Sequence, residues 1–80
     1  MLKIYGTGQC PDCVKCKEEL DAAGVEYLYL DIMDKMLFLK QFLRLREDPA
    51  FEQIRKAGYI GIPCIVREDG SITFDWKEFM

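Results

Sequence analysis

Two strand-like segments with one helix-length segment between them constrain the fold of this chain most strongly. Residues 2–5 alternate at the strand period, and residues 25–31 are rich in aromatic and apolar side chains that favour strands. Between them, Pro11 suits the first position of a helix and Gly24 suits its C-terminal cap. A helical crossover joins parallel strands, so this part of the sequence predicts a βαβ unit.

The middle of the chain predicts two consecutive helical pieces. Residues 35–47 place apolar side chains at three- and four-residue steps, as one face of a helix requires. Asp48 and Pro49 interrupt this pattern, because Asp48 suits a helix N-cap and Pro49 suits the first helical position. The second piece is expected to run to Ala57 and to end at Gly58.

The C-terminal part predicts an antiparallel hairpin. Residues 64–67 and 71–75 are strand-like, and Asp69-Gly70 between them signals a two-residue turn. Residues 76–80 are compatible with one helical turn. Together these elements predict an α/β fold over residues 1–80, a single domain in which a four-stranded mixed sheet is flanked by helices.

Charge and hydropathy exclude several classes of function. The formal net charge is −3 and there is no histidine, so the chain has no basic patch to bind nucleic acid or an anionic membrane surface. No apolar run approaches the roughly 20 residues that span a bilayer, and the N-terminus lacks the pattern of a signal peptide. We expect a monomeric, cytoplasmic protein that binds neither nucleic acid nor membranes.

Three of the four cysteines lie within seven residues, in Cys10-Pro11-Asp12-Cys13-Val14-Lys15-Cys16. Such local spacing cross-links nothing distant, and in an intracellular chain it indicates redox or metal chemistry. A Cys-x-x-Cys pair at the start of a helix suits dithiol–disulfide exchange, since one helical turn separates the two sulfurs.

The two cysteines of this pair are predicted to have different roles. The unpaired N–H groups and the positive end of the helix dipole stabilise a thiolate at Cys10, so Cys10 is predicted to attack. Cys13 lies one turn inside the helix and can resolve a mixed disulfide on Cys10. The carboxylate of Asp12 opposes thiolate formation and weakens this activation.

Cys16 and Cys64 have a structural and a functional interpretation. Cys16 shares the helical face of Cys13 and Leu20, which favours a place in the core. Cys64 alternates within a strand but enters the neighbourhood of Cys10, so it can serve the core or the site.

As an alternative function, all four thiols offer ligands to zinc or an iron–sulfur cluster. Helix geometry makes joint chelation by the three local cysteines awkward. An adaptor function for the apolar helix at 35–47 is a third interpretation.

The sequence resembles the glutaredoxin family over most of its length. The segment Cys10-Pro11-Asp12-Cys13 after the first strand is similar to the family's Cys-Pro-x-Cys site, and Ile62-Pro63 before the hairpin is similar to its Thr-Val-Pro segment. The resemblance implies a thioredoxin-like fold and thiol–disulfide oxidoreductase activity on protein or low-molecular-weight disulfides. It also implies a cis bond before Pro63 and substrate contacts from Pro11, Ile62 and Pro63.

Three departures from the family pattern bear on the reductant. Thr7 stands where the family usually has a lysine, and Thr73-Phe74 stands where paired glycines usually precede an acidic residue, here Asp75. The segment between Asp31 and Pro63 is longer than usual by roughly three helical turns. We therefore expect no bound cofactor and weak use of glutathione. The expected reductant is a flavoenzyme of the thioredoxin-reductase type or another dithiol.

Phe74 and the single tryptophan, Trp76, are expected in the core.

Overall fold

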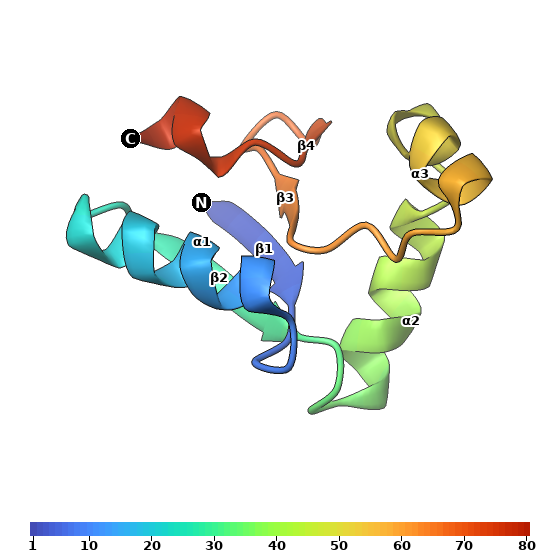
Figure 1. Ribbon diagram of the computed structural model, residues 1–80, viewed down its shortest axis with the longest axis horizontal. Helices are drawn as coiled ribbons and strands as arrows, with labels where there is room; N and C mark the ends of the chain where they lie inside the picture. Colours follow the sequence, from blue (N-terminus) through green and yellow to red (C-terminus); the bar gives the residue numbers. More distant parts are fainter.

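The computed structural model describes all 80 residues and contains one four-stranded sheet in the order β2-β1-β3-β4 (Figure 1). Strand β1 (Leu2–Gly6) pairs in parallel with β2 (Tyr27–Asp31) and antiparallel with β3 (Cys64–Val66). Strand β4 (Ile72–Thr73) extends the sheet antiparallel to β3. The predicted α/β class and mixed sheet are confirmed.

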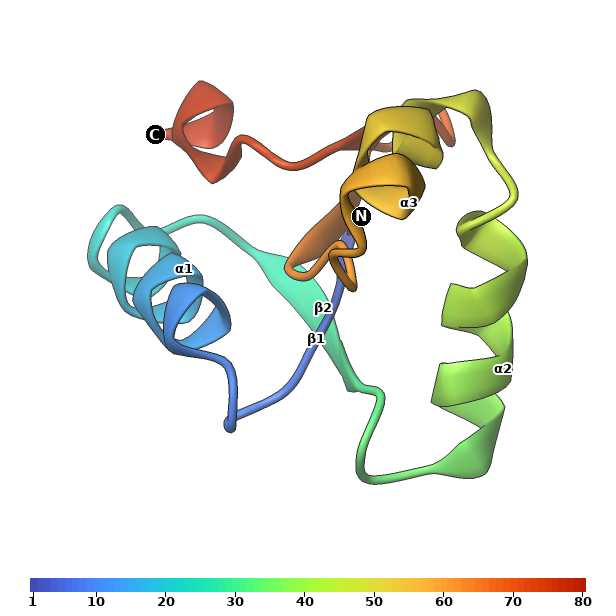
Figure 2. The same ribbon diagram turned by 45° about the vertical axis from the view of Figure 1, so that its right-hand side comes forward.

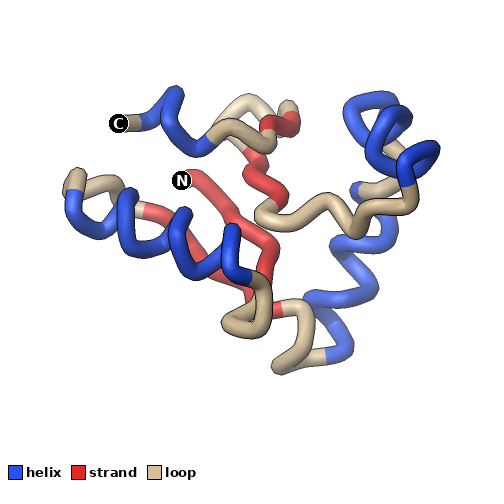
Figure 3. The backbone as a smooth tube through the Cα atoms, in the orientation of Figure 1, coloured by secondary structure: helices blue, strands red, loops and turns tan.

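Helices cover both faces of this sheet (Figure 2). Helix α1 (Pro11–Ala22) lies on one face and is contacted by the short C-terminal helix η2 (Trp76–Phe79). On the other face lie α2 (Met36–Leu45), the single turn η1 (Pro49–Phe51) and α3 (Glu52–Ala57). A long connection then returns from α3 to β3 (Figure 3). No helix of this fold has both the length and the apolar character needed to cross a membrane.

The alternation of side chains along β1 divides the core into two clusters. The cluster under α1 contains Leu2, Ile4, Cys16, Leu20 and Ile65. The cluster on the opposite face contains Tyr5, Leu30, Ile32, Phe42, Phe51 and Cys64. Edge-to-face aromatic pairs hold the second cluster together, with ring centroids 6.0 Å apart for Phe42 and Phe51 and 5.0 Å apart for Phe51 and Phe74.

The bounds of β2 and β4 differ from the predicted ranges, and α2 is shorter than the predicted 35–47. Strand β2 begins at Tyr27 because the N–H of Val25 bonds to the carbonyl of Leu20, 3.0 Å away, and closes the C-terminus of α1 together with Gly24. Strand β4 is limited to two residues, Ile72 and Thr73.

The predicted two-residue hairpin turn is wrong. The N–H of Arg67 bonds to the carbonyl of Ser71 at 2.8 Å, so three residues, 68–70, form the loop. Gly70 has φ +89°, which lets the third loop residue rejoin the strand without steric cost, as in a hairpin with a glycine bulge.

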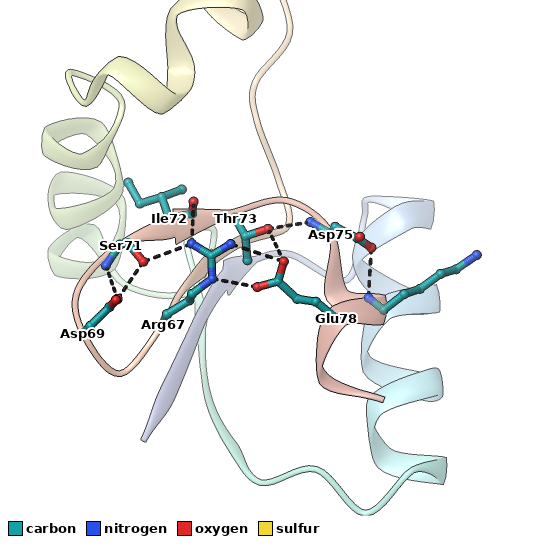
Figure 4. A network of polar contacts seen from close by, with 8 residues as sticks. Arg67, Asp69, Ser71, Ile72, Thr73, Asp75 and Glu78 are labelled. Atoms are coloured by element: carbon teal, nitrogen blue, oxygen red, sulfur yellow. Dashed lines mark hydrogen bonds and ion pairs between the residues drawn. The ribbon is translucent and has the colours of Figure 1, made fainter.

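A polar network joins this hairpin to η2, which is the helical turn expected near the C-terminus (Figure 4). Arg67 donates from Nε to Oε1 of Glu78 at 2.6 Å and from Nη2 to Oε2 at 3.2 Å. The hydroxyl of Thr73 donates to the same carboxylate at 3.2 Å. On the other side of η2, the indole N–H of Trp76 donates to Glu19 of α1 at 3.0 Å. The C-terminal turn is therefore fixed to both the sheet and α1.

Candidate functional site

The side chain of Cys10 is the N-cap of α1. Its sulfur accepts a hydrogen bond from the backbone N–H of Cys13 at 3.3 Å, which is the contact that a serine or aspartate oxygen usually makes at this position. Pro11 occupies the first turn, where its missing N–H costs nothing, and the N–H of Cys10 bonds to the carbonyl of Thr7 at 3.2 Å. The sulfur of Cys10 thus lies at the positive end of the helix dipole.

The two thiols of the Cys-x-x-Cys pair differ in exposure. Cys10 is partly exposed, whereas Cys13 is fully buried. Burial, and after it the nearby Cys10 side chain, raises the pKa of the Cys13 thiol to about 12, although the backbone of Thr7 opposes this change. Cys13 therefore remains a protonated thiol at neutral pH while Cys10 is open to a reactant.

Gly6 at the end of β1 makes room for Cys13. A Cβ atom at Gly6 would lie 2.8 Å from the sulfur of Cys13 and 2.8 Å from the hydroxyl oxygen of Tyr29. A larger residue there would force apart the strand and the first turn of α1. Glycine at position 6 therefore fixes how closely Cys13 and Tyr29 approach the strand end.

A cleft of about 790 Å³ opens beside Cys10. Most of its wall is apolar, and Asp12 is the one charged residue among those that line it. The lining residues are Thr7, Gln9, Cys10, Asp12, Ile32, Met33, Ile54, Gly58, Tyr59, Ile60, Gly61, Ile62, Pro63, Phe74 and Trp76. The cleft therefore suits an apolar ligand better than an anionic one.

The connection from α3 to β3 forms one wall of this cleft. Arg46 bonds to it directly, and Arg55 bonds to the segment that carries Arg46. Arg46 donates to the carbonyl of Tyr59 at 3.0 Å, and Arg55 donates to the carbonyls of Arg46 and, at 3.3 Å, Asp48. Gly61 has φ +92° and packs so closely that a Cβ there would lie 2.6 Å from the ring of Phe51. The segment that is long for the resembled family thus supplies wall residues between 54 and 61, and no motif or spacing had predicted them as part of the site.

The sequence-predicted substrate contacts fall in different places. Ile62 and Pro63 both line the cleft, and the peptide bond between them is cis, as the resemblance implied. Pro11 is exposed at the start of α1 and is not among the lining residues. Phe74 and Trp76 pack against the two core clusters but also face the cleft, so assigning them to the core alone is wrong.

Cys16 and Cys64 are core residues. Both are fully buried, each in a different cluster, and neither lines the cleft. Burial and the nearby Glu19 raise the pKa of Cys16 to about 11, and burial and Asp48 raise that of Cys64 to about 12. No group of three or more histidine, cysteine or acidic side chains is arranged to hold a metal ion, because the thiols point into separate clusters. The metal-binding alternative therefore has no support.

Comparisons with known proteins agree with this geometry. A model of the glutaredoxin family matches residues 2–70. An "Uncharacterized protein" of Haemophilus influenzae is 40% identical over 73 residues, a match that covers 90% of this chain and 85% of that protein. The crystal structure of the thioredoxin-like protein BC3987 is similar with a TM-score of 0.61 and 22% identity, covering 99% of this chain and 94% of that one. A mutant of the same protein gives a TM-score of 0.65 at 22% identity, covering 99% and 93%.

Proposed function

The chain belongs to the glutaredoxin family, and we propose that it is a thiol–disulfide oxidoreductase in which Cys10 attacks and Cys13 resolves. One observation carries the proposal. A partly exposed thiol caps a helix at the edge of a cleft, while its partner is buried one turn inside the same helix. This arrangement separates an accessible nucleophile from a shielded resolving group.

In the first step the thiolate of Cys10 attacks one sulfur of a substrate disulfide. A bond forms between Cys10 and that sulfur, the substrate S–S bond breaks, and the other half leaves as a thiolate that takes up a proton. The N–H of Cys13 and the end of the α1 dipole stabilise the attacking thiolate. The carboxylate of Asp12, in the first turn of α1, partly opposes this effect.

In the second step Cys13 attacks the sulfur of Cys10 in the mixed disulfide. The Cys10–Cys13 bond forms, the bond from Cys10 to the substrate breaks, and the substrate leaves as a reduced thiol. The proton of the Cys13 thiol leaves in the same step and is taken up by the departing thiolate. Because Cys13 is buried, it cannot compete with Cys10 for the incoming disulfide.

The cleft supports an apolar protein or peptide disulfide as the preferred substrate. Its walls offer Met33, Tyr59 and Ile60, which are all largely exposed, and no lysine or arginine. Ile62 and Pro63 line the same cleft, and an extended substrate segment could lie along them.

The lining of the same cleft also indicates which class of reductant can regenerate the Cys10–Cys13 dithiol. Glutathione carries two carboxylates, and the cleft offers neither a cation nor a glycine pair to receive them. Phe74 fills space where a ligand backbone would need close approach. We therefore propose that a protein reductant, a flavoenzyme of the thioredoxin-reductase type or another dithiol, restores the Cys10–Cys13 dithiol.

Turnover of a protein disulfide tests the proposed function. The reduced protein is mixed with insulin and a low concentration of dithiothreitol, and cleavage of the insulin disulfides is followed by turbidity. The wild type should accelerate cleavage and Cys10→Ser should not. Cys16→Ala is the matched control, because it removes a buried thiol from the same helix and should keep activity at a modest cost in stability. Equal rates for wild type and Cys10→Ser would refute the assignment.

A further inference from the structure

The hydroxyl group of Tyr29 is buried and has no hydrogen-bond partner. Its neighbour on the same face of β2, Tyr27, donates to Asp21 at 2.7 Å instead. Leaving a buried hydroxyl unpaired costs free energy, so an orphaned one at a reactive site calls for a functional explanation.

Packing places this hydroxyl near the sulfur of Cys13. The ring of Tyr29 packs against the cluster under α1, and the ammonium group of Lys17 lies 4.2 Å from its centroid. The hydroxyl oxygen and the sulfur of Cys13 both lie 2.8 Å from the point where a Cβ of Gly6 would be. The two atoms are therefore separated by no more than twice that distance, in the space that the missing side chain leaves.

The protonation state of the Tyr29 phenol suits a hydrogen-bond donor and not a general base. Burial, followed by the charges that Cys13, Asp31, Cys10 and Cys16 carry when ionised, raises the pKa of Tyr29. At neutral pH it therefore keeps its proton. The other ionisable groups around it are Lys17 above the ring and, along the neighbouring surface, Glu18 and Asp21.

We propose that the hydroxyl of Tyr29 donates a hydrogen bond to the sulfur of Cys13 as this sulfur becomes the resolving thiolate. The inference rests on the proposed function. In the mixed disulfide the sulfur of Cys10 carries no charge, so one of the influences that hold the proton on Cys13 is gone. The sulfur of Cys13 then turns toward Cys10 beside Gly6, and the free O–H of Tyr29 is the donor within reach.

The step balances without a further reactant. The thiol of Cys13 gives up its proton, which the departing substrate thiolate takes up. The electron pair of Cys13 forms the bond to Cys10, and the pair of the Cys10–substrate bond leaves with the substrate. Tyr29 stabilises the negative charge on sulfur with its hydrogen bond and keeps its own proton throughout.

Replacing Tyr29 by phenylalanine should slow this step alone. Loss of one hydrogen bond to a charged sulfur should raise the pKa of Cys13 by about 1–2 pH units. The lower thiolate fraction is partly offset by a more nucleophilic thiolate, which leaves resolution about threefold to tenfold slower at neutral pH. The deficit should shrink as the pH rises, since the thiolate then forms without help. Tyr27→Phe is the matched control, because its hydroxyl faces Asp21.

The experiment mixes each reduced protein with hydroxyethyl disulfide, quenches in acid and measures by mass spectrometry the adduct on Cys10 and the internal disulfide. In Tyr29→Phe the adduct should accumulate and decay slowly, whereas in Tyr27→Phe it should decay as in the wild type. Equal decay in Tyr29→Phe and wild type, at every pH, would overturn the inference. If the wild type forms neither the adduct nor the internal disulfide, the proposed function fails instead.

A second measurement is independent of exchange. In protein that carries Cys10→Ser, Cys16→Ala and Cys64→Ala, with and without Tyr29→Phe, Cys13 is the single thiol and its ionisation is followed by thiolate absorbance. The midpoint should move to higher pH when Tyr29 is replaced. Because the native hydroxyl is unpaired, Tyr29→Phe should not lower the free energy of unfolding. A loss of stability with an unchanged midpoint would assign Tyr29 a structural role only.

Discussion

The backbone N–H of Cys13 donates a hydrogen bond to the sulfur of Cys10 across 3.3 Å, while the side chain of Cys13 is fully buried. In the mechanism that we propose, this residue stabilises the attacking thiolate of Cys10 through its backbone and withholds its own thiol for the next step. The proposed order of events follows from this division, because a substrate can reach the partly exposed Cys10 but not the buried Cys13.

Gly58 and Gly61 both have left-handed backbone conformations, but only Gly61 packs closely against the core. Replacing each of them by alanine should therefore lower the free energy of unfolding by different amounts. Gly61→Ala should lower the free energy of unfolding by about 2–5 kcal/mol, since φ is +92° and the new Cβ would overlap the ring of Phe51. Gly58→Ala, with φ +79° and open space around it, should cost only about 1–2 kcal/mol. Urea unfolding of both variants measures the difference. Equal losses would mean that contact with Phe51 is not what requires Gly61.

The three buried thiols predict a loss of stability in alkali. The pKa values of Cys13, Cys16 and Cys64 are raised from 9.0 to about 12, 11 and 12. Above pH 9 the unfolded chain ionises these thiols while the folded chain keeps their protons, so the folded state binds more protons and loses stability as the pH rises. The decline should begin near pH 9 and continue through the raised values.

The Cys16→Ala variant isolates the contribution of one thiol to this loss of stability in alkali. Between pH 9 and about 11, each buried thiol should contribute about 1.4 kcal/mol per pH unit to the slope of stability against pH. Urea unfolding of the reduced protein at several pH values should therefore give a shallower slope for Cys16→Ala than for the wild type. Identical slopes would show that Cys16 titrates alike in the folded and unfolded chain.

Reduction by glutathione should be slow and sensitive to Asp12. The carboxylate of Asp12 lies in the cleft wall without a cation beside it, so it repels the carboxylates of glutathione. Asp12→Asn should speed reduction of the Cys10–Cys13 disulfide by glutathione, by no more than about fivefold for an exposed charge. Glu18→Gln, an exposed change on the same helix and outside the cleft, should leave the rate unchanged.

A direct comparison of reductants checks the same prediction. At equal disulfide concentration, a thioredoxin-reductase-type flavoenzyme with its nucleotide should reduce the protein faster than glutathione at cellular concentration. Rapid, saturable reduction by glutathione alone would contradict the expectation and indicate that the missing lysine is compensated elsewhere.

Local sequence signals were sufficient for the βαβ unit and for the position of the Cys-x-x-Cys pair at the start of α1. Alternation in residues 2–5, the helix start at Pro11 and the terminator Gly24 each act within a few residues, so the pattern alone locates the elements. The burial of Cys16 follows in the same way from helical spacing. The hairpin loop was mispredicted because the positive φ of Gly70 serves a two-residue and a three-residue loop equally well.

The remaining features depend on packing between distant segments. The cleft wall at 58–61 is set by the bond from Arg46 to Tyr59 and by the packing of Gly61 on Phe51, which no local pattern encodes. The approach of Tyr29 to Cys13 depends on the register that pairs Ile4 with Tyr29 and leaves Gly6 at the strand end. Aromatic residues that serve the core and the cleft together, such as Trp76, carry the same sequence signal as core residues.

Trapping the mixed disulfide tests the central claim most directly. Cys13→Ser protein is incubated with an oxidised protein substrate, separated without reductant, digested and analysed by mass spectrometry. Because the resolving thiol is absent and Cys16 and Cys64 are buried, a stable adduct should form and map to Cys10, while Cys10→Ser should form none. An adduct that maps to Cys13 in the Cys10→Ser protein, with none on Cys10 in the Cys13→Ser protein, would reverse the assigned roles and contradict the account.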